Sequence, residues 1–365
     1  MLKIHTFEMQ KVINSHNEMV RIWEKLKGIQ FESVQRESYT RFRYYGLAGS
    51  GVIIIVFWYR YKKHGEIRLQ ITPCTVLGIQ KDTMLFNVSE EDFLQCLWRV
   101  EQILNKFYLS LCYCRMSRVD FAQDVRFERS EIIDTVIRLL IRTGAPRYYH
   151  NKVYCDKIYN NSYNIEAQEG DEVVVYNKEK QCADRGNNQN ARMKGVMRIE
   201  IRINISNQSQ QIFMGNELYF LRLLEVREYA EFKIKYVFQE GFYVKLGKVK
   251  EILNKELKGG DGSKRQRNRL EKMIRFAEGV AIHQSLNKCT GGKTALFCYD
   301  TTKDIRNQLR ERRINLVSIS AKEPIVVIPD ILYMLGMKSE LEMQRDNEFL
   351  MEHNLLNKMP VYELL

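Results

Sequence analysis

The amino-acid sequence predicts an α+β fold, in which a mostly antiparallel sheet carries helices on one face and a mainly helical C-terminal region follows. Two observations lead to this class. Residues 39–206 are rich in short β-branched and aromatic runs with two amphipathic helical stretches between them, and after residue 206 apolar residues recur at helical spacing. We therefore expect an N-terminal helical segment at 1–38, an α+β domain at 39–206 and a helical domain at 207–365.

The first expected elements are a short polar helix and three strands. The helix is expected around Val12–Leu26, and the strands at Tyr39–Tyr45, Val52–Tyr59 and Ile67–Ile71. Pro73 ends the last of these strands because proline cannot donate to the ladder of a sheet.

Two helices are expected next, on either side of a strand at Met116–Val125. Ser89 followed by Asp92 forms a capping-box pattern, and apolar residues then step at helical spacing to residue 107. Ser130 can cap the second helix, which Gly144 ends.

Three more strands and a long helix complete the pattern. The strands are expected at Val153–Tyr159, Glu172–Lys178 and Val196–Ile205, and the helix at Asn216–Val237. A short β run at Ile325–Ile328 lies in the helical region. The spacing leaves open whether the two strand groups are a diverged duplication.

The composition favours a folded protein with a polyanionic partner. The 365 residues are 45% hydrophobic and 11% aromatic, which is enough for a core, and the formal net charge is +12. The eight cysteines include no CxxC pair, so we expect reduced thiols and a cytoplasmic location. No apolar run reaches the about 18 residues of a membrane span, and we expect no membrane partner and no signal peptide.

Alternate positions of three predicted strands carry polar side chains. Residues at i and i+2 of a strand share a face, so Tyr176 and Lys178 point one way and Val173 and Val175 the other. Two other strands carry charges in the same way: Arg118, Asp120 and Asp124 in one, and Arg198, Glu200 and Arg202 in the other. If these strands are neighbours, one face of the sheet is apolar and the other gathers a tyrosine, a lysine, carboxylates and arginines.

Asp120 and Glu200 are the expected ligands of a Mg²⁺ or Mn²⁺ ion, since these cations prefer oxygen ligands. Asp124 shares the face of Asp120 but lies about 13 Å further along a strand, so we expect it to be peripheral. The alternative is that these carboxylates form ordinary cross-strand ion pairs with the arginines at 118, 198 and 202.

Tyr176 is the expected nucleophile. A phenol has a pKa near 10, and the neighbouring cation of Lys178 favours the phenolate. The alternative is a sheet tyrosine beside a solvated lysine. Tyr159 and Tyr163 are the nearest competing phenols.

Other site types have weaker support. None of the six histidines is paired in a metal-binding motif, and Gly291–Thr294 fails as a phosphate-binding loop because Asn287 stands at the required first glycine. A Gly-rich hinge precedes four basic residues that form either a solvated turn or an arm that contacts DNA phosphates: Lys264, Arg265, Arg267 and Arg269.

The ordered motifs Ile71-Thr72-Pro73, Ser117–Asp120, Val174–Lys178 and Met197–Arg202 resemble those of the replication initiators of filamentous phages. Related proteins occur on rolling-circle plasmids and integrated elements. The resemblance covers residues 65–205, and it departs from the family in the Thr-Pro turn and in the C-terminal region. It implies a rolling-circle endonuclease-like fold and metal-dependent nicking and joining of DNA. The nucleophile would be Tyr176, and the family's Asp and Glu correspond to Asp120 and Glu200.

The function that the resemblance implies is initiation of replication by site-specific nicking of single-stranded DNA at a rolling-circle origin, through a 5′-phosphotyrosyl intermediate. The expected partners are origin DNA, both the single-stranded nick site and the adjacent duplex, and a host helicase and polymerase. The expected DNA contacts are Arg118, Arg198, Arg202, Lys264, Arg265, Arg267 and Arg269. The alternatives are a relaxase for conjugative transfer with the same chemistry and a non-catalytic DNA-binding regulator.

Overall fold

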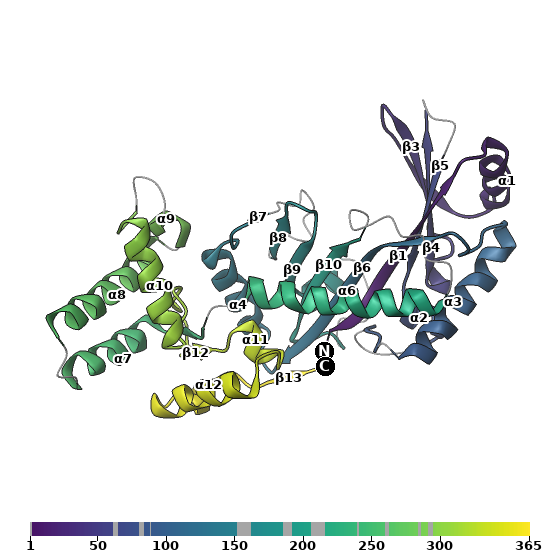
Figure 1. Cartoon of the computed structure of the whole chain (residues 1–365). Helices are drawn as coiled ribbons and strands as arrows, with labels where there is room; N and C mark the ends of the chain where they lie inside the picture. The colour runs from purple at the N-terminus through teal and green to yellow at the C-terminus, as the bar shows by residue number, and fades with distance from the viewer. Residues whose placement is uncertain are drawn as a thin grey trace. The chain divides into compact units, whose positions relative to one another are not determined.

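The chain folds into two compact units, each built from several stretches of sequence (Figure 1). The computed structural model describes residues 2–60, 65–79, 84–87, 89–151, 162–184, 192–205, 216–238, 241–259, 263–283, 286–290 and 295–365. Unit 1 comprises Met1–Gln123, Ala167–Glu172 and Glu200–Phe232, and unit 2 comprises Asp124–Glu166, Val173–Ile199 and Lys233–Leu365.

Unit 1 is organised around an antiparallel sheet with the strand order β2-β3-β4-β5-β1-β6. The bounds are β1 Lys3–Ile13, β2 Phe31–Gln35, β3 Tyr39–Tyr44, β4 Val52–Tyr59, β5 Gly65–Ile71 and β6 Arg115–Phe127. Burial alternates along β4, where Ile54 and Val56 are buried and their neighbours are half-buried, as expected for a strand with one face on the core.

Helices pack on the apolar face of this sheet. They are α1 His16–Leu26, α2 Pro73–Leu77, α3 Glu90–Leu104 and the first part of α6 Asn216–Val237, with single turns η1 Ala48–Ser50 and η2 Asn105–Phe107. Phe93 of α3 lies with its ring centroid 5.6 Å from that of Phe7 of β1. The predicted cap is confirmed, since the Ser89 hydroxyl accepts a hydrogen bond from the Asp92 amide.

Unit 2 contains the remainder of the strands and most of the C-terminal helices. Its strands follow the order β6-β10-β9-β8-β7, and it contains the end of β6 and the start of β10. The bounds are β7 Tyr149–Asn151, β8 Tyr163–Ala167, β9 Glu172–Asn177 and β10 Val196–Asn204. A further strand, β13 Tyr362–Leu364, pairs with β6. Helices α4 Glu131–Thr143 and α5 Lys178–Asp184 lie between these strands in sequence.

The C-terminal part of unit 2 is mainly helical, as predicted. Its elements are β11 Tyr243–Val244, α7 Leu246–Gly259, α8 Lys264–His283, α9 Leu286–Thr290, α10 Tyr299–Glu311, β12 Val327–Ile328, α11 Ile331–Met334, α12 Glu340–Glu352 and η5 Leu356–Lys358. Strands β11 and β12 form a separate antiparallel pair. Among the described residues, none of the helices has both the length and the apolarity that a membrane span requires.

The strand topology is repeated within the chain. The first repeat comprises β1, α1 and β2 to β5, and its strand order is β2-β3-β4-β5-β1. The second repeat comprises β6, α4 and β7 to β10, and its strand order is β7-β8-β9-β10-β6. The last strand of each copy carries nearly the same sequence, EIRLQI at Glu66–Ile71 and EIRINI at Glu200–Ile205. Topology and sequence together therefore support the duplication that strand spacing left open.

Three expectations about local structure need correction. Residues 1–38 contain the expected helix, α1, but they are not a helical segment as a whole, because Lys3–Ile13 forms β1, which pairs with β5 and β6 inside the sheet. The strand expected at Glu172–Lys178 ends at Asn177, and Lys178 begins α5. Residues 264–269 are the first turns of α8 instead of a flexible arm. The strand expected at Val153–Tyr159, including Tyr159, lies outside the described residues.

Candidate functional site

Polar side chains gather on the face of the unit 1 sheet opposite the helices. In the β1–β6 pair, Thr6 lies opposite Asp120 and Glu8 lies opposite Arg118. Phe7, between Thr6 and Glu8, points to the core, since successive strand residues alternate in direction. The strand periodicity that makes a core on one side therefore collects charges on the other.

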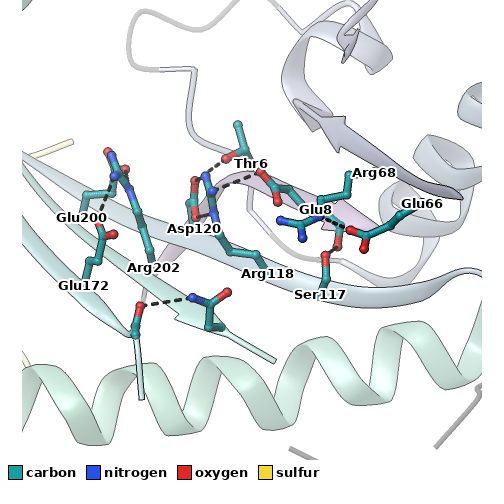
Figure 2. Close-up of polar contacts among 12 residues, drawn as sticks. Thr6, Glu8, Glu66, Arg68, Ser117, Arg118, Asp120, Glu172, Glu200 and Arg202 are labelled. Atoms are coloured by element: carbon teal, nitrogen blue, oxygen red, sulfur yellow. Dashed lines mark hydrogen bonds and ion pairs between the residues drawn. The ribbon is translucent and has the colours of Figure 1, made fainter. Parts of the chain in front are cut away.

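Arg118 is the centre of the first group of contacts (Figure 2). Its Nε and Nη2 atoms donate to the two carboxylate oxygens of Asp120, both at 2.7 Å, and its Nη1 lies 3.1 Å from Glu8 Oε1. Thr6 Oγ1 donates to Asp120 Oδ2 at 2.7 Å. Asp120 is 3% exposed whereas the Arg118 side chain is 28% exposed, so the guanidinium lies between a buried carboxylate and solvent.

Arg202 is the centre of the second group. Its Nε donates to Glu200 Oε1 at 2.8 Å, and its Nη1 donates to Glu172 Oε2 at 3.0 Å. The Ile205 amide donates to the Ser117 carbonyl at 2.8 Å, a register that places Asp120 opposite Arg202 on the neighbouring strand. The two groups are thus adjacent on neighbouring strands.

A third group occupies the equivalent strand of the first repeat. Arg68 Nε bonds Glu66 Oε1, and Tyr59 Oη donates to Glu66 Oε2 at 3.1 Å. Gln10 lies opposite Arg68 in the first repeat, at the position that corresponds to Asp120 opposite Arg202 in the second. The neutral amide in one copy and the carboxylate in the other make the second copy the more acidic site.

These side chains form what we call the carboxylate–arginine cluster, drawn together in Figure 2: Thr6, Glu8, Glu66, Arg68, Arg118, Asp120, Glu172, Glu200 and Arg202. Its five carboxylates exceed its three guanidinium groups by two. Burial raises the pKa of Glu8 above its ordinary value, although Arg118 opposes the shift. The neighbouring carboxylate of Asp120 raises the pKa of Glu8 further.

The chemistry of these donors fits a divalent cation. Carboxylate oxygens and a hydroxyl are the ligands that Mg²⁺ and Mn²⁺ prefer, and an excess of negative charge is what a divalent ion neutralises. Among the described residues, three or more acidic, histidine or cysteine side chains do not converge in metal-binding geometry. The arginines hold the carboxylates here, so an ion would have to replace Arg118 beside Asp120 or Arg202 beside Glu200.

Tyr176 and Lys178 lie close together in unit 2, but they belong to different elements and not to one strand as predicted. Tyr176 is in β9, and Lys178 is the first residue of α5. Lys178 Nζ lies 5.7 Å from the centroid of the Tyr176 ring, a cation–π distance, and donates to Gln181 Oε1 at 2.7 Å. Tyr176 is 5% exposed and Lys178 is half-buried, so the lysine is less solvated than the alternative of a sheet tyrosine beside a solvated lysine supposed.

Asp124 and Arg198 form a fully buried ion pair in unit 2. Arg198 Nε and Nη2 donate to Asp124 Oδ1 and Oδ2 at 2.7 and 2.8 Å, and both side chains are 0% exposed. The cross-strand ion pair considered from the sequence is therefore what occurs at this position. The expectation that Arg198 contacts DNA is wrong, because its guanidinium has no exposed surface.

The basic residues at 264–269 lie at the start of α8. Ser263 Oγ accepts from the Gln266 amide at 3.3 Å and caps this helix. Lys264, Arg265 and Arg267 are exposed, whereas Arg269 is half-buried and lies 3.3 Å from Asp304. The four side chains therefore project from the first two turns of a helix.

Sequence reasoning missed five members of the cluster, namely Thr6, Glu8, Glu66, Arg68 and Glu172. The repeated Glu-Ile-Arg of β5 and β10 was the signal that could have found Glu66 and Arg68. Thr6 and Glu8 carry no such signal, since they join the site only through the β1–β6 register. No family model and no curated protein matches this chain.

Proposed function

We propose that this chain is a metal-dependent endonuclease that nicks and rejoins single-stranded DNA to start rolling-circle replication. The supporting observation is the carboxylate–arginine cluster. It unites Asp120 and Glu200, the two residues that the family resemblance identifies as metal ligands, and it has an excess of negative charge on a partly exposed face. The ordered motifs of residues 65–205 provide the second support.

In this proposal the arginines exchange partners during the reaction. Asp120 and Glu200 would hold the ion, with Thr6 orienting Asp120, and the ion would polarise the scissile phosphate. Arg118 and Arg202 would then bind DNA phosphate, for which the planar guanidinium is suited, because each is already partly exposed.

Tyr176 would act as the nucleophile of the proposed reaction. Its Oη would form a bond to phosphorus while the bond from phosphorus to the 3′-oxygen breaks. The phenolic proton would pass to solvent and the departing 3′-oxygen would take a proton from solvent, so that the products would be a 5′-phosphotyrosyl DNA end and a free 3′-hydroxyl. Lys178 Nζ lies 5.7 Å from the centroid of the Tyr176 ring, and in this proposal its ammonium would stabilise the negative charge of the phosphate in the transition state. Rejoining would be the reverse displacement by the 3′-hydroxyl.

A neighbouring surface of unit 1 has the chemistry to hold the DNA strand. In β3 and β4, Tyr39 lies opposite Tyr59 and Arg41 lies opposite Phe57, on the face that also carries Arg68. The Tyr39 ring centroid is 5.5 Å from that of Phe57 and 6.1 Å from that of Tyr59. Residues 31–71 contain seven Lys and Arg against three Asp and Glu. Half-buried aromatic rings beside cations are suited to stacking bases and to binding phosphates.

The pairing of each carboxylate with an arginine favours one competing function, a non-catalytic DNA-binding protein. In that case the cluster would be a permanent ion-pair network, and Arg118 would hold Asp120 in both the free and the DNA-bound protein. A relaxase would use the same chemistry as an initiator, and the genes that surround the coding sequence distinguish these two roles.

Covalent trapping separates the enzyme from the regulator. The purified chain is incubated with 3′-labelled single-stranded DNA of random sequence and Mn²⁺, and adducts that survive denaturing gels are counted. We expect an adduct with the wild type, and none with Tyr176→Phe, Asp120→Asn or Glu200→Gln, although these variants still bind DNA. Tyr163→Phe is the matched control, since Tyr163 is a buried phenol of the adjacent strand, and it should retain the adduct.

The outcomes are distinguishable. An adduct that persists in Tyr176→Phe would show that another residue is the nucleophile, and Tyr159 or Tyr163 would be tested next. An adduct that forms equally well in EDTA would remove the metal from the proposal. DNA binding without any adduct in the wild type would support the regulator.

A further inference from the structure

Unit 2 contains a cavity of about 440 Å³, a volume within the range of small-ligand sites. Its wall includes the end of α4, the loop that follows it, α10 and the segment that contains Asn315 and Leu316. All of its lining residues belong to unit 2, and none belongs to the carboxylate–arginine cluster.

The wall is cationic. Lys303, Arg306 and Arg310 of α10 line the cavity at spacings of three and four residues, which place them on one face of the helix, and Arg147 lines it from the loop after α4. Of the described lining residues, Asp330 alone is acidic, and its carboxylate lies 2.6 Å from Lys338 Nζ. Among the described lining residues, basic side chains therefore outnumber acidic ones.

The charges of α10 are segregated between its faces. Its three acidic residues, Asp300, Asp304 and Glu311, are absent from the cavity wall, and Asp304 lies 3.3 Å from Arg269 of α8. If the basic residues served only to solubilise this helix, cations and carboxylates would be mixed on an exposed face. Their position along a concave surface indicates an anionic ligand.

Aromatic and amide side chains complete the wall. Tyr236 Oη donates to the Arg147 carbonyl at 3.0 Å, and Tyr163 Oη donates to the Gly144 carbonyl at 3.1 Å, so both rings are held against the loop after α4. Tyr299 is 75% exposed and also lines the cavity, and Asn307 offers a donor and an acceptor. Rings that can flank a planar group and an amide that can bind its edge are what a nucleobase requires.

We propose that this cavity binds a mononucleotide. Its phosphates would lie along Lys303, Arg306 and Arg310, and its base would lie against the tyrosines. A cavity of this volume is large enough for one nucleotide, whereas a strand of several nucleotides would extend beyond it. The proposal is independent of the proposed nicking activity, because no residue is shared between the two sites.

The test measures binding of ATP, dTTP and pyrophosphate to the full-length protein by calorimetry, with a single-stranded oligonucleotide as a competitor. We expect ATP or dTTP to bind, and the double variant Arg306→Met and Arg310→Met to weaken binding at least about tenfold. Lys303→Met should weaken it as well, and this side chain is exposed, so the variant should fold. Lys272→Met is the matched control, since it removes an exposed cation from α8 outside the cavity, and it should bind as the wild type does.

Several results would overturn the proposal. The proposal is wrong if neither nucleotide binds at millimolar concentration, or if Lys303→Met binds nucleotide as tightly as the wild type does. It is also wrong if pyrophosphate binds as tightly as ATP, because the base would then contribute nothing. If the oligonucleotide abolished nucleotide binding in both the wild type and Lys272→Met, the cavity would instead be part of a groove that binds a nucleic-acid strand.

Discussion

Replacing Asp124 by Asn should destabilise the protein severely without removing a catalytic group. Asn has nearly the same shape, so no cavity forms, but the Arg198 guanidinium is left charged and 0% exposed without its carboxylate. Breaking a buried ion pair on one side costs about 3–5 kcal/mol. With a urea m-value of about 3 kcal/mol per molar, the unfolding midpoint should fall by about 1 M or more.

Circular dichroism during urea titration measures this shift. The double variant Asp124→Leu and Arg198→Met removes both charges, and it should recover most of the lost stability, because apolar replacements of buried ion pairs are often neutral. The matched control is Glu363→Gln, which breaks the exposed pair that Arg126 of the same strand forms at 3.0 Å, and it should cost less than about 1 kcal/mol. A loss below about 1 kcal/mol in Asp124→Asn, or a double variant as unstable as the single one, would refute the assigned structural role.

Phe57→Leu should weaken binding of single-stranded DNA by about 1–3 kcal/mol, because a base loses its stacking partner, and it should leave the affinity for duplex DNA unchanged. An equal loss of affinity for single-stranded and duplex DNA would contradict a stacking role. Burial raises the pKa of Glu8, so the folded protein binds this proton more tightly than the unfolded chain. The stability that protonated Glu8 contributes is complete below pH 4.5 and is lost as the pH rises through its folded-state pKa. The stability of Glu8→Gln, measured by urea titration between pH 4.5 and 7, should therefore fall less with pH than that of the wild type; parallel curves would contradict the shift. The last variant replaces four basic residues of α8 by Ala, namely Lys264, Arg265, Arg267 and Arg269. It should flatten the slope of log K against log salt on duplex DNA by a few units, since each phosphate contact contributes about −0.9 to this slope. An unchanged slope would show that these side chains only face solvent.

The two repeats differ at the position that faces the conserved Glu-Ile-Arg sequence, and this difference favours the second repeat as the candidate metal site. Both repeats keep the Glu-Ile-Arg strand, Glu66–Arg68 in one and Glu200–Arg202 in the other. The opposite strand differs, with Gln10 facing Arg68 and Asp120 facing Arg202. A carboxylate in place of an amide adds the charge that a divalent ion needs, while the first repeat keeps the aromatic and arginine side chains.

Local sequence patterns determined the fold class and the bounds of several elements. The strand Val52–Tyr59 and the helix Asn216–Val237 have the bounds expected from the sequence, and Ser89 caps its helix as predicted. These features depend on side chains a few residues apart, and their physical causes are contained in the local sequence. The same periodicity indicated that Asp120, Glu200 and Arg202 lie on polar faces.

Only the tertiary structure decided which of these polar residues meet. Asp120 and Asp124 share one strand and one face, yet Asp120 lies beside a partly exposed arginine and Asp124 lies beside a fully buried one. Thr6 and Glu8 join the site from a segment more than 100 residues away, through the β1–β6 register. Strand partners, and the burial that sets the energy of each charge, depend on contacts between distant segments, which no local pattern of residues specifies.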